Sequence, residues 1–272
     1  MIKELLLARV VVFIDGQNFR KALKGLRFTT AEGVFRPEET QVKWHGFFSE
    51  AVKRLSRLAG FEHKLVRVYW YTVARIGTYM LPDEVDERVK WHARALGVSG
   101  GELLSAARRW VDEERRRLER IRAAYDIIEA EQPFVEFRYV GQLALAPFEP
   151  WQPETRVENG RLVSYAGTRR GEKGVDLGMA LDMVAKMHSY DAALLASGDA
   201  DFLPVVRHLK NNMKWVYLFS LLNEPDDFHY TSADLRIHVD LAFQMTRDDL
   251  APFLIVSKLP PYARAIVKEA KQ

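Results

Sequence analysis

The sequence predicts an α/β fold in which a mostly parallel sheet is flanked by helices. Short apolar runs bounded by turn residues alternate with segments of helical pattern. Most runs lack the polar–apolar alternation of a strand with one wet face, so we expect strands covered on both sides. Two segments interrupt the alternation. We therefore expect one domain over residues 1–272, with a helical insertion at about 82–132 and a hairpin insertion at about 147–174.

The expected elements follow in chain order. The strands are residues 9–14, 65–73, 134–139, 192–196, 215–219 and 237–239. The helices between them are residues 17–24, 42–59, 176–188 and 201–211, and a last helix begins near Thr246. Asp249 follows Thr246 at the spacing of a capping box. Asn159-Gly160, between short β-like flanks, is typical of a type I′ hairpin turn.

The helical insertion contains a heptad seam with one polar break, at Glu114. Its apolar members are Leu104, Ala107, Val111, Leu118, Ile121, Tyr125 and Ile128. A seam this short is typical of a helix that docks onto its own domain, and the mixed-sign run EERRRLERIR predicts a solvated opposite face. The insertion is also the candidate surface for a homo-oligomer.

Composition excludes several classes of protein. The chain has 272 residues, of which 48% are hydrophobic and 28% charged, as in ordinary globular proteins. It contains no Cys, which excludes disulfides, thiolate metal sites and a Cys nucleophile, and agrees with the cytoplasmic location that we expect. No run approaches the roughly 18 apolar residues of a membrane helix, so no membrane partner is expected. A net charge of +3 permits a polyanionic partner without requiring one.

Carboxylates follow two of the expected strands directly. The stretch VVVFIDGQNF places Asp15, and then Asn18, after the first strand, and LLASGDADF places Asp199 and Asp201 after a later one. In parallel α/β sheets the functional crevice lies at the carboxyl ends of the strands. Asp176, near the start of a helix, is a third candidate. Converging carboxylates require a compensating cation, and oxygen ligands without Cys or clustered His favour Mg²⁺ or Mn²⁺.

A structural interpretation stands beside the functional one. Each aspartate taken alone is explained by a helix cap, and Asn18 by a bond to a first-turn backbone group. Asp182 lies six residues after Asp176, on another face of the helix, and is assigned to solvent or to a supporting position. The repetition of a strand that ends in Asp is what favours a metal site.

Three blocks of the sequence resemble the signature of the NYN domain, a PIN-like nuclease superfamily that includes the LabA-like proteins. They are FIDGQN at residues 13–18, KGVDLGMALDM at residues 173–183 and LLASGDADFLPVV at residues 194–206. The resemblance implies a PIN-like, Rossmann-like fold and a divalent-metal-dependent ribonuclease. It also implies that Asp15, Asp176 and Asp199 bind the metal, with Asp201 as an auxiliary acid and Asn18 as a polar residue beside Asp15.

The expected substrate is RNA, in single-stranded form. Ser197 and the backbone amides of residues 198–200 lie at a predicted helix N-terminus, where they can hold a phosphate. Arg169, Arg170 and Lys173 precede the acidic helix in what reads as a Gly-flanked loop, which suits a phosphate backbone and equally suits a solubilising role.

Two other functions stay open at this point. A non-catalytic RNA-binding or regulatory module would keep the fold and bind RNA without cleaving it. A metal-dependent phosphatase would use the same carboxylates, but the aspartyl-phosphate type has Asp-x-Asp after its first strand, and Gln17 stands at the second acidic position here.

Overall fold

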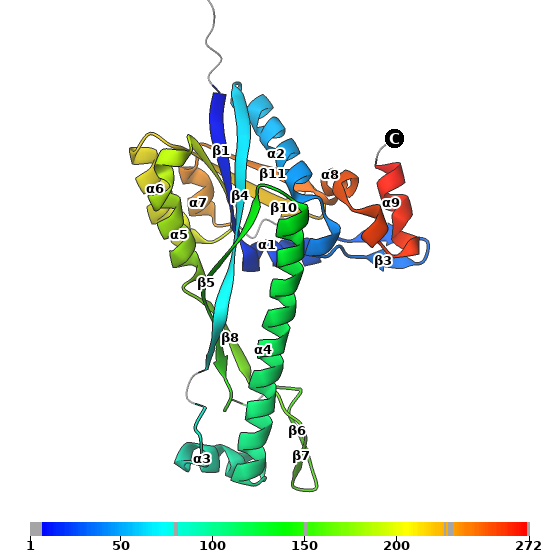
Figure 1. Ribbon diagram of the computed structural model, residues 1–272, viewed down its shortest axis with the longest axis vertical. Helices are drawn as coiled ribbons and strands as arrows, with labels where there is room; N and C mark the ends of the chain where they lie inside the picture. Colours follow the sequence, from blue (N-terminus) through cyan, green and yellow to red (C-terminus); the bar gives the residue numbers. More distant parts are fainter. Residues whose placement is uncertain (1–6, 79–80, 150–151, 226, 228–230, 271–272) are drawn as a thin grey trace, which may run out of the picture. The chain divides into compact units, whose positions relative to one another are not determined.

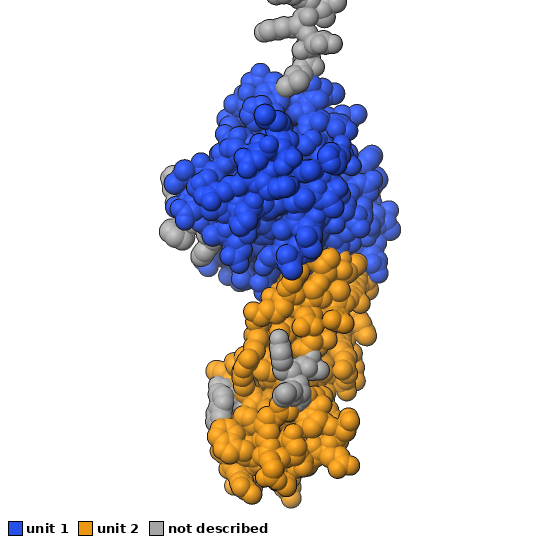
Figure 2. Space-filling model, turned by 90° about the vertical axis from the view of Figure 1, so that its left-hand side faces the viewer, with its two compact units in different colours: residues 1–72, 124–138, 176–272 blue, residues 73–123, 139–175 orange. Residues whose placement is uncertain are grey.

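We describe the protein from a computed structural model in which residues 7–78, 81–149, 152–225, 227 and 231–270 are described. The chain divides into two compact units (Figure 2). The first unit is formed by Met1–Thr72, Ala124–Arg138 and Asp176–Gln272, and the second by Val73–Ala123 and Tyr139–Val175. The single-domain organisation expected from the sequence stays a prediction.

The described residues contain a sheet of seven strands in the order β11-β10-β9-β1-β4-β5-β8 (Figure 1). The strands are β1 (Leu7–Asp15), β4 (Glu62–Thr78), β5 (Val135–Ala146), β8 (Thr168–Lys173), β9 (Ala192–Ala196), β10 (Trp215–Leu222) and β11 (Leu241–Thr246). The pairs β11–β10, β10–β9, β9–β1 and β1–β4 are parallel, and β5–β8 is antiparallel. The predicted α/β fold with a mostly parallel sheet is confirmed.

Helices of the first unit lie on both sides of its sheet, with α1 and α2 on one side and α5 and α6 on the other (Figure 1). They include α1 (Gly16–Gly25), α2 (Trp44–Ala59), α5 (Val175–Ala185), α6 (Leu203–Asn211), α7 (Ala233–His238), α8 (Arg247–Leu250) and α9 (Arg264–Glu269). Shorter elements are β2 (Phe28–Thr30), β3 (Gly33–Phe35) and the 3₁₀ turns η1 (Glu39–Gln41), η2 (Met187–Ser189), η3 (Ala200–Phe202), η4 (Ala251–Phe253), η5 (Val256–Lys258) and η6 (Pro261–Ala263).

An aromatic cluster packs α1 and α2 onto the sheet. Phe19 of α1 meets Trp44 of α2 and Trp70 of β4 edge to face, with ring centroids 5.6 and 5.2 Å apart. Phe219 of β10 completes the cluster against Phe48 of α2. Edge-to-face contacts of this kind stabilise a core beyond the area that they bury. They fix α1, and therefore the residues at its N-terminus, against the middle of the sheet.

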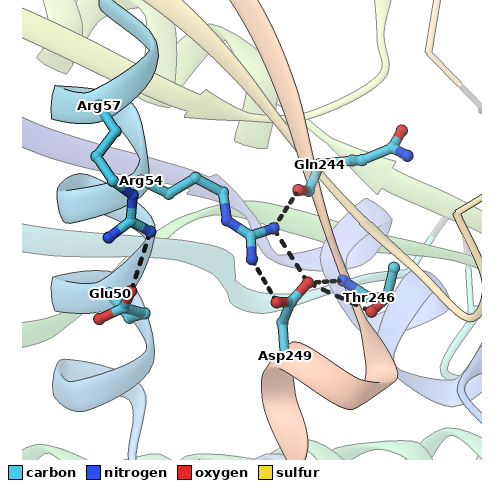
Figure 3. Close-up of polar contacts among 6 residues, drawn as sticks. All are labelled: Glu50, Arg54, Arg57, Gln244, Thr246 and Asp249. Atoms are coloured by element: carbon cyan, nitrogen blue, oxygen red, sulfur yellow. Dashed lines mark hydrogen bonds and ion pairs between the residues drawn. The ribbon is translucent and has the colours of Figure 1, made fainter. Parts of the chain in front are cut away.

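Arg54 of α2 forms hydrogen bonds with the C-terminal elements (Figure 3). Arg54 donates from Nη1 to the carbonyl oxygen of Gln244 and to Oδ2 of Asp249, each at 3.1 Å. Asp249 also accepts from the backbone N–H of Thr246 at 2.8 Å, which completes the predicted capping box at the start of α8. This arrangement holds the carboxyl end of β11 against α2.

Two expectations about local structure were wrong. Residues 237–239 are not a strand: they end α7, and the last strand of the sheet is β11, which begins at Leu241. Residues 168–173 are not a loop but strand β8, because they pair antiparallel with β5. A short apolar run cannot be assigned to helix or strand by pattern alone, and a polar edge strand has no apolar face to reveal it.

The second unit has its own apolar core. It contains α3 (Glu87–Leu96), most of α4 (Gly100–Glu131), part of β4 and β5, and β8. Val89 and Leu103 belong to one cluster that Phe148 closes, and Trp110 and Val111 pack with Leu145 in another. Strands β6 (Arg156–Glu158) and β7 (Arg161–Ser164) form the predicted hairpin, and its turn residues have the positive φ of a type I′ turn.

The predicted heptad seam lies on the buried side of α4. Six of its members are buried: Leu104, Ala107, Val111, Leu118, Tyr125 and Ile128. Glu114, the polar break, is only 5% exposed, and its carboxylate accepts hydrogen bonds from Arg169 of β8 at 2.8 and 2.5 Å. The arginines Arg115, Arg116 and Arg120 are exposed on the helix.

Among the described residues, no helix combines the length and apolar character that crossing a membrane requires.

Gly16, the first residue of α1, allows the helix to start directly on the sheet. A Cβ added there would lie 2.2 Å from the carbonyl oxygen of Tyr71 and 2.8 Å from Nε1 of Trp70. We expect Gly16→Ala to lower the free energy of unfolding by about 1–3 kcal/mol, because the backbone must shift. Gly25→Ala, in the same helix with nothing within 4 Å of the added atom, is the control and should cause no loss. Urea denaturation of both variants checks this, and equal stabilities would contradict it.

Candidate functional site

Asp15 is buried at the carboxyl end of β1, in the middle of the sheet. Its side chain is the N-cap of α1, and Oδ1 accepts from the backbone N–H groups of Gln17 and Asn18, each at 3.1 Å. Oδ2 accepts from the hydroxyl of Ser197 at 3.0 Å and from the side-chain amide of Asn18. Four donors therefore satisfy a carboxylate that is 3% exposed, as a buried charge requires.

Ser197 joins the ends of the two neighbouring strands. Because β1 and β9 are parallel and Ile14 pairs with Ala196, the residues that follow these strands lie side by side. Besides its bond to Asp15, the Ser197 Oγ accepts from the backbone N–H of Asp199 at 3.2 Å. Its only proton points at Asp15. Ser197 is thus bonded to Asp15 and to the turn of Asp199, and its contact with a phosphate stays a prediction.

Asp199 and Asp201 follow β9 in the turn that begins η3. Asp199 is the N-cap of η3 and accepts from the backbone N–H of Asp201 at 3.0 Å. The carbonyl oxygen of Gly198 accepts from the backbone N–H of Ser232 at 2.9 Å, which ties this turn to the start of α7. This contact could not be predicted from the sequence, because Ser232 donates through its backbone. Asp201 is exposed.

Asp176 lies in the first turn of α5, where burial and other carboxylates raise its pKa. Burial raises its pKa to about 6, and three negative charges add to the effect. They are the carboxylates of Asp15, Asp199 and Asp201. The carboxylates that act on the pKa of Asp176 come from the end of β1 and from the turn at η3, so three elements of the first unit contribute to this cluster.

The arrangement has the donor chemistry of a divalent-cation site without a closed coordination sphere. Carboxylate oxygens are the ligands that Mg²⁺ and Mn²⁺ prefer, and clustered negative charge is what a cation relieves. In the described part of the chain, however, no three Asp, Glu, His or Cys side chains lie close enough together to hold a metal ion in common. Asp15 and Asp199 are also helix caps, so the structural interpretation holds beside the functional one. The shared cation stays a prediction.

The three basic candidates belong to the second unit. Arg169 is bound to Glu114, and Arg170 to Glu149, within that unit. Lys173 is exposed, and no ion pair to it occurs among residues that the structure describes. Of the three, Lys173 alone presents a charge that no carboxylate engages.

A comparison with known protein families finds a match that contains two of the three sequence blocks, residues 173–183 and 194–206. The NYN domain family matches residues 101–258, which is more than half of the chain. The chain belongs to the NYN domain family. NYN domains are part of the PIN-like nuclease superfamily, whose members are nucleases that generally use divalent metals. The match includes Asp176, Ser197, Asp199 and Asp201 and begins after Asp15 and Asn18. It is a match to the family as a whole and does not single out the LabA-like proteins.

The solved structures similar to this chain include a protein of unknown function from Vibrio parahaemolyticus. The two chains share 15% sequence identity, and the alignment covers 89% of this chain and 95% of that protein with a TM-score of 0.40. No curated protein matches the chain.

The raised pKa of Asp176 predicts how this NYN domain responds to pH. Since the folded state holds the proton up to about pH 6 and an unfolded Asp releases it near its ordinary pKa, stability falls as pH rises between these values. Asp176→Asn removes the repelled charge. It should raise the free energy of unfolding above pH 6 by about 1 kcal/mol, a value reduced for solvent screening, and should change nothing below pH 4.

The matched control is Asp182→Asn in the same helix. Burial opposes ionisation of Asp182, but hydrogen bonds from Lys186 and Tyr71 outweigh it and lower the pKa of its carboxyl. Asp182→Asn should therefore reduce stability at neutral pH. Melting curves in chelator between pH 4 and pH 8 distinguish the two. A stability loss for Asp176→Asn at pH 8 would mean that its charge is not repelled.

Proposed function

We propose that this NYN domain is a divalent-metal-dependent ribonuclease that hydrolyses phosphodiester bonds of single-stranded RNA. The observation that carries the proposal is that Asp176 of α5 feels the charge of three other carboxylates, which follow the parallel strands β1 and β9. Such a concentration of like charge opposes folding unless a cation compensates it, so a function is the reason to retain it. Membership of a nuclease superfamily gives the chemistry that the carboxylates serve.

Asp15, Asp176 and Asp199 are the residues that would hold Mg²⁺ or Mn²⁺. When bound, the cation would supply Lewis-acid chemistry, activating a water molecule and stabilising charge on the leaving oxygen. The residues of the chain prepare this site. Asn18 and Ser197 both donate to Oδ2 of Asp15 and so fix the orientation of this carboxylate. Asp201, exposed at the start of η3, is available as the auxiliary acid.

Charge distribution supports contact between RNA and the second unit. The residues of that unit include 16 Lys and Arg against 13 Asp and Glu, a difference of +3, which equals the net charge of the whole chain. The first unit, which contains the acids, has no net charge. An RNA backbone needs cationic neutralisation outside the acidic site. Among the basic candidates, Lys173 is the residue that we assign to a phosphate contact.

Asp199→Asn tests the assignment as a nuclease. Asn caps a helix about as well as Asp, so the variant keeps the cap and loses the charge. We expect cleavage of single-stranded RNA in Mg²⁺ or Mn²⁺ to fall by about 100-fold or more with the melting temperature preserved. Asp86→Asn is the matched control, since Asp86 caps α3 through a 2.8 Å bond from the Val89 N–H. It should keep full activity.

Three outcomes of that experiment are informative. Metal-dependent cleavage by the wild type and by Asp86→Asn, lost with chelator and in Asp199→Asn, supports the proposal. Equal activity in all three proteins would make the carboxylates structural. RNA binding without cleavage in any metal would identify a regulatory RNA-binding module instead, the alternative favoured by the absence of a closed metal-binding group among the described residues.

Lys173 and Arg169 should respond differently to loss of charge. Lys173→Gln removes a free cation, so KM for single-stranded RNA should rise about three- to tenfold, and the slope of log affinity against log salt should fall by about one. Arg169→Gln removes the guanidinium that donates two hydrogen bonds to the buried Glu114 and should lower the free energy of unfolding by about 1–3 kcal/mol. Cleavage kinetics at several salt concentrations, with urea denaturation, separate the two roles. A salt response that is stronger in Arg169→Gln would reverse the assignment.

A further inference from the structure

A buried hydrogen bond connects the helix of Asp176 to the strand beside Asp15. Tyr71 of β4 is fully buried, and its hydroxyl donates to Oδ2 of Asp182 on α5 at 2.9 Å. Tyr71 is the register partner of Asp15 in the β1–β4 pair. Asp182 lies six residues after Asp176, about 9 Å along the axis of the same helix. One bond therefore links α5, which carries Asp176, to β4, the strand that pairs with the one carrying Asp15.

Basic residues keep Asp182 in the form that accepts this bond. Lys186 places Nζ 2.8 Å from Oδ1, and Arg138 places Nε 3.9 Å from Oδ2. Both cations also lie over the ring of Tyr69, at 5.6 and 4.9 Å from its centroid. Ionised Asp182 thus accepts a charge-assisted hydrogen bond, which is stronger than a bond between neutral groups.

The helix needs such a connection because its first turn faces like charges. Asp176 is repelled by three carboxylates, and this repulsion acts to move the start of α5 away from them. Apolar contacts hold one side of the helix, where Val175, Met179 and Met183 are buried. The opposite side is open to solvent, with Leu177 64% and Leu181 62% exposed. These two leucines therefore contribute little to holding α5 against the sheet.

We propose that Tyr71 and Asp182 are positioning residues that hold Asp176 among the acids and so set the affinity of the site for a divalent cation. The proposal rests on the function proposed above and adds two residues to it. Neither residue touches the reacting atoms. Their effect is exerted through the orientation of α5, in the way that supporting hydrogen bonds commonly fix metal ligands.

A merely structural role would give a different result from a positioning role, and the chain offers a matched control. Tyr190 is also fully buried, and its hydroxyl donates at 2.6 Å to the carbonyl oxygen of Met183, on the same helix. That bond makes no connection to β4. Tyr71→Phe and Tyr190→Phe each delete one buried hydroxyl that bonds α5, and both should lower the melting temperature by a similar amount.

The decisive measurement is Mn²⁺ affinity, followed by electron paramagnetic resonance of the free ion at a temperature where all proteins are folded. We expect Tyr71→Phe to raise the Kd for Mn²⁺ about five- to tenfold, and Tyr190→Phe to leave it within about twofold of the wild type. The Mn²⁺ concentration for half-maximal RNA cleavage should rise by the same factor, with kcat at saturating metal little changed. Equal Kd values in the two variants would overturn the proposal.

A second readout separates this inference from the proposed function. If the wild type neither binds Mn²⁺ nor cleaves RNA, the metal-dependent nuclease is wrong, and hydrogen–deuterium exchange decides the positioning role on its own. Faster exchange in residues 175–179 of Tyr71→Phe than of Tyr190→Phe supports the connection between α5 and β4. Equal exchange in the two variants shows that the bond only adds stability.

Discussion

The parallel pairing of β1 with β9 is the constraint on which the rest of the site depends. Strands whose ends are about 180 positions apart in the chain are placed side by side, so that Ser197 can donate to Asp15 at 3.0 Å. Both strands are buried along the paired residues, and a slip of one residue would turn Asp15 and every apolar neighbour to the wrong side. Packing of the sheet therefore fixes the positions of Asp15 and Ser197 at the carboxyl ends of β1 and β9.

That constraint gives the four carboxylates different conditions. Asp15 is buried but fully hydrogen-bonded, Asp199 is partly occupied as a cap, and Asp201 is exposed. Asp176 is the member whose environment opposes its charge most. Its ionisation and the position of α5 are consequently the features that a bound cation would change, while Asp15 is already in a fixed orientation. The site joins a rigid half on β1 and β9 to a half that has to be held in place.

The sequence predicted the parts of the fold that depend on local pattern. β9 has the bounds expected from its apolar run, because Ser197-Gly198 ends it sharply. The run at residues 237–239 misled, since Ile237 is 76% exposed at the end of a short helix and the true edge strand, β11, has a mixed burial pattern. Strand ends also led to the prediction that Asp15 and Asp199 share a cation, which stays a prediction. The Tyr71–Asp182 bond could not be predicted, because it joins residues 111 positions apart through the register of the sheet.

A tertiary contact explains why a carboxylate stands in the apolar seam of α4. Glu114 is the one polar break of that seam in the sequence, and the structure pairs it with Arg169 of β8. These hydrogen bonds satisfy Glu114, since a buried carboxylate needs a cation and a guanidinium supplies two aligned donors.

Asp15 lies outside the segment that matches the NYN domain family. The matched segment, residues 101–258, contains three of the four acids but not β1. Yet β1 lies between β9 and β4, and Asp15 is bonded to Ser197 of the matched segment. Without β1 the parallel sheet would be interrupted at its centre, and Ser197 would lose the acceptor for its proton. Strand β1 is therefore part of the same site as the matched segment on physical grounds, even though the match begins after it.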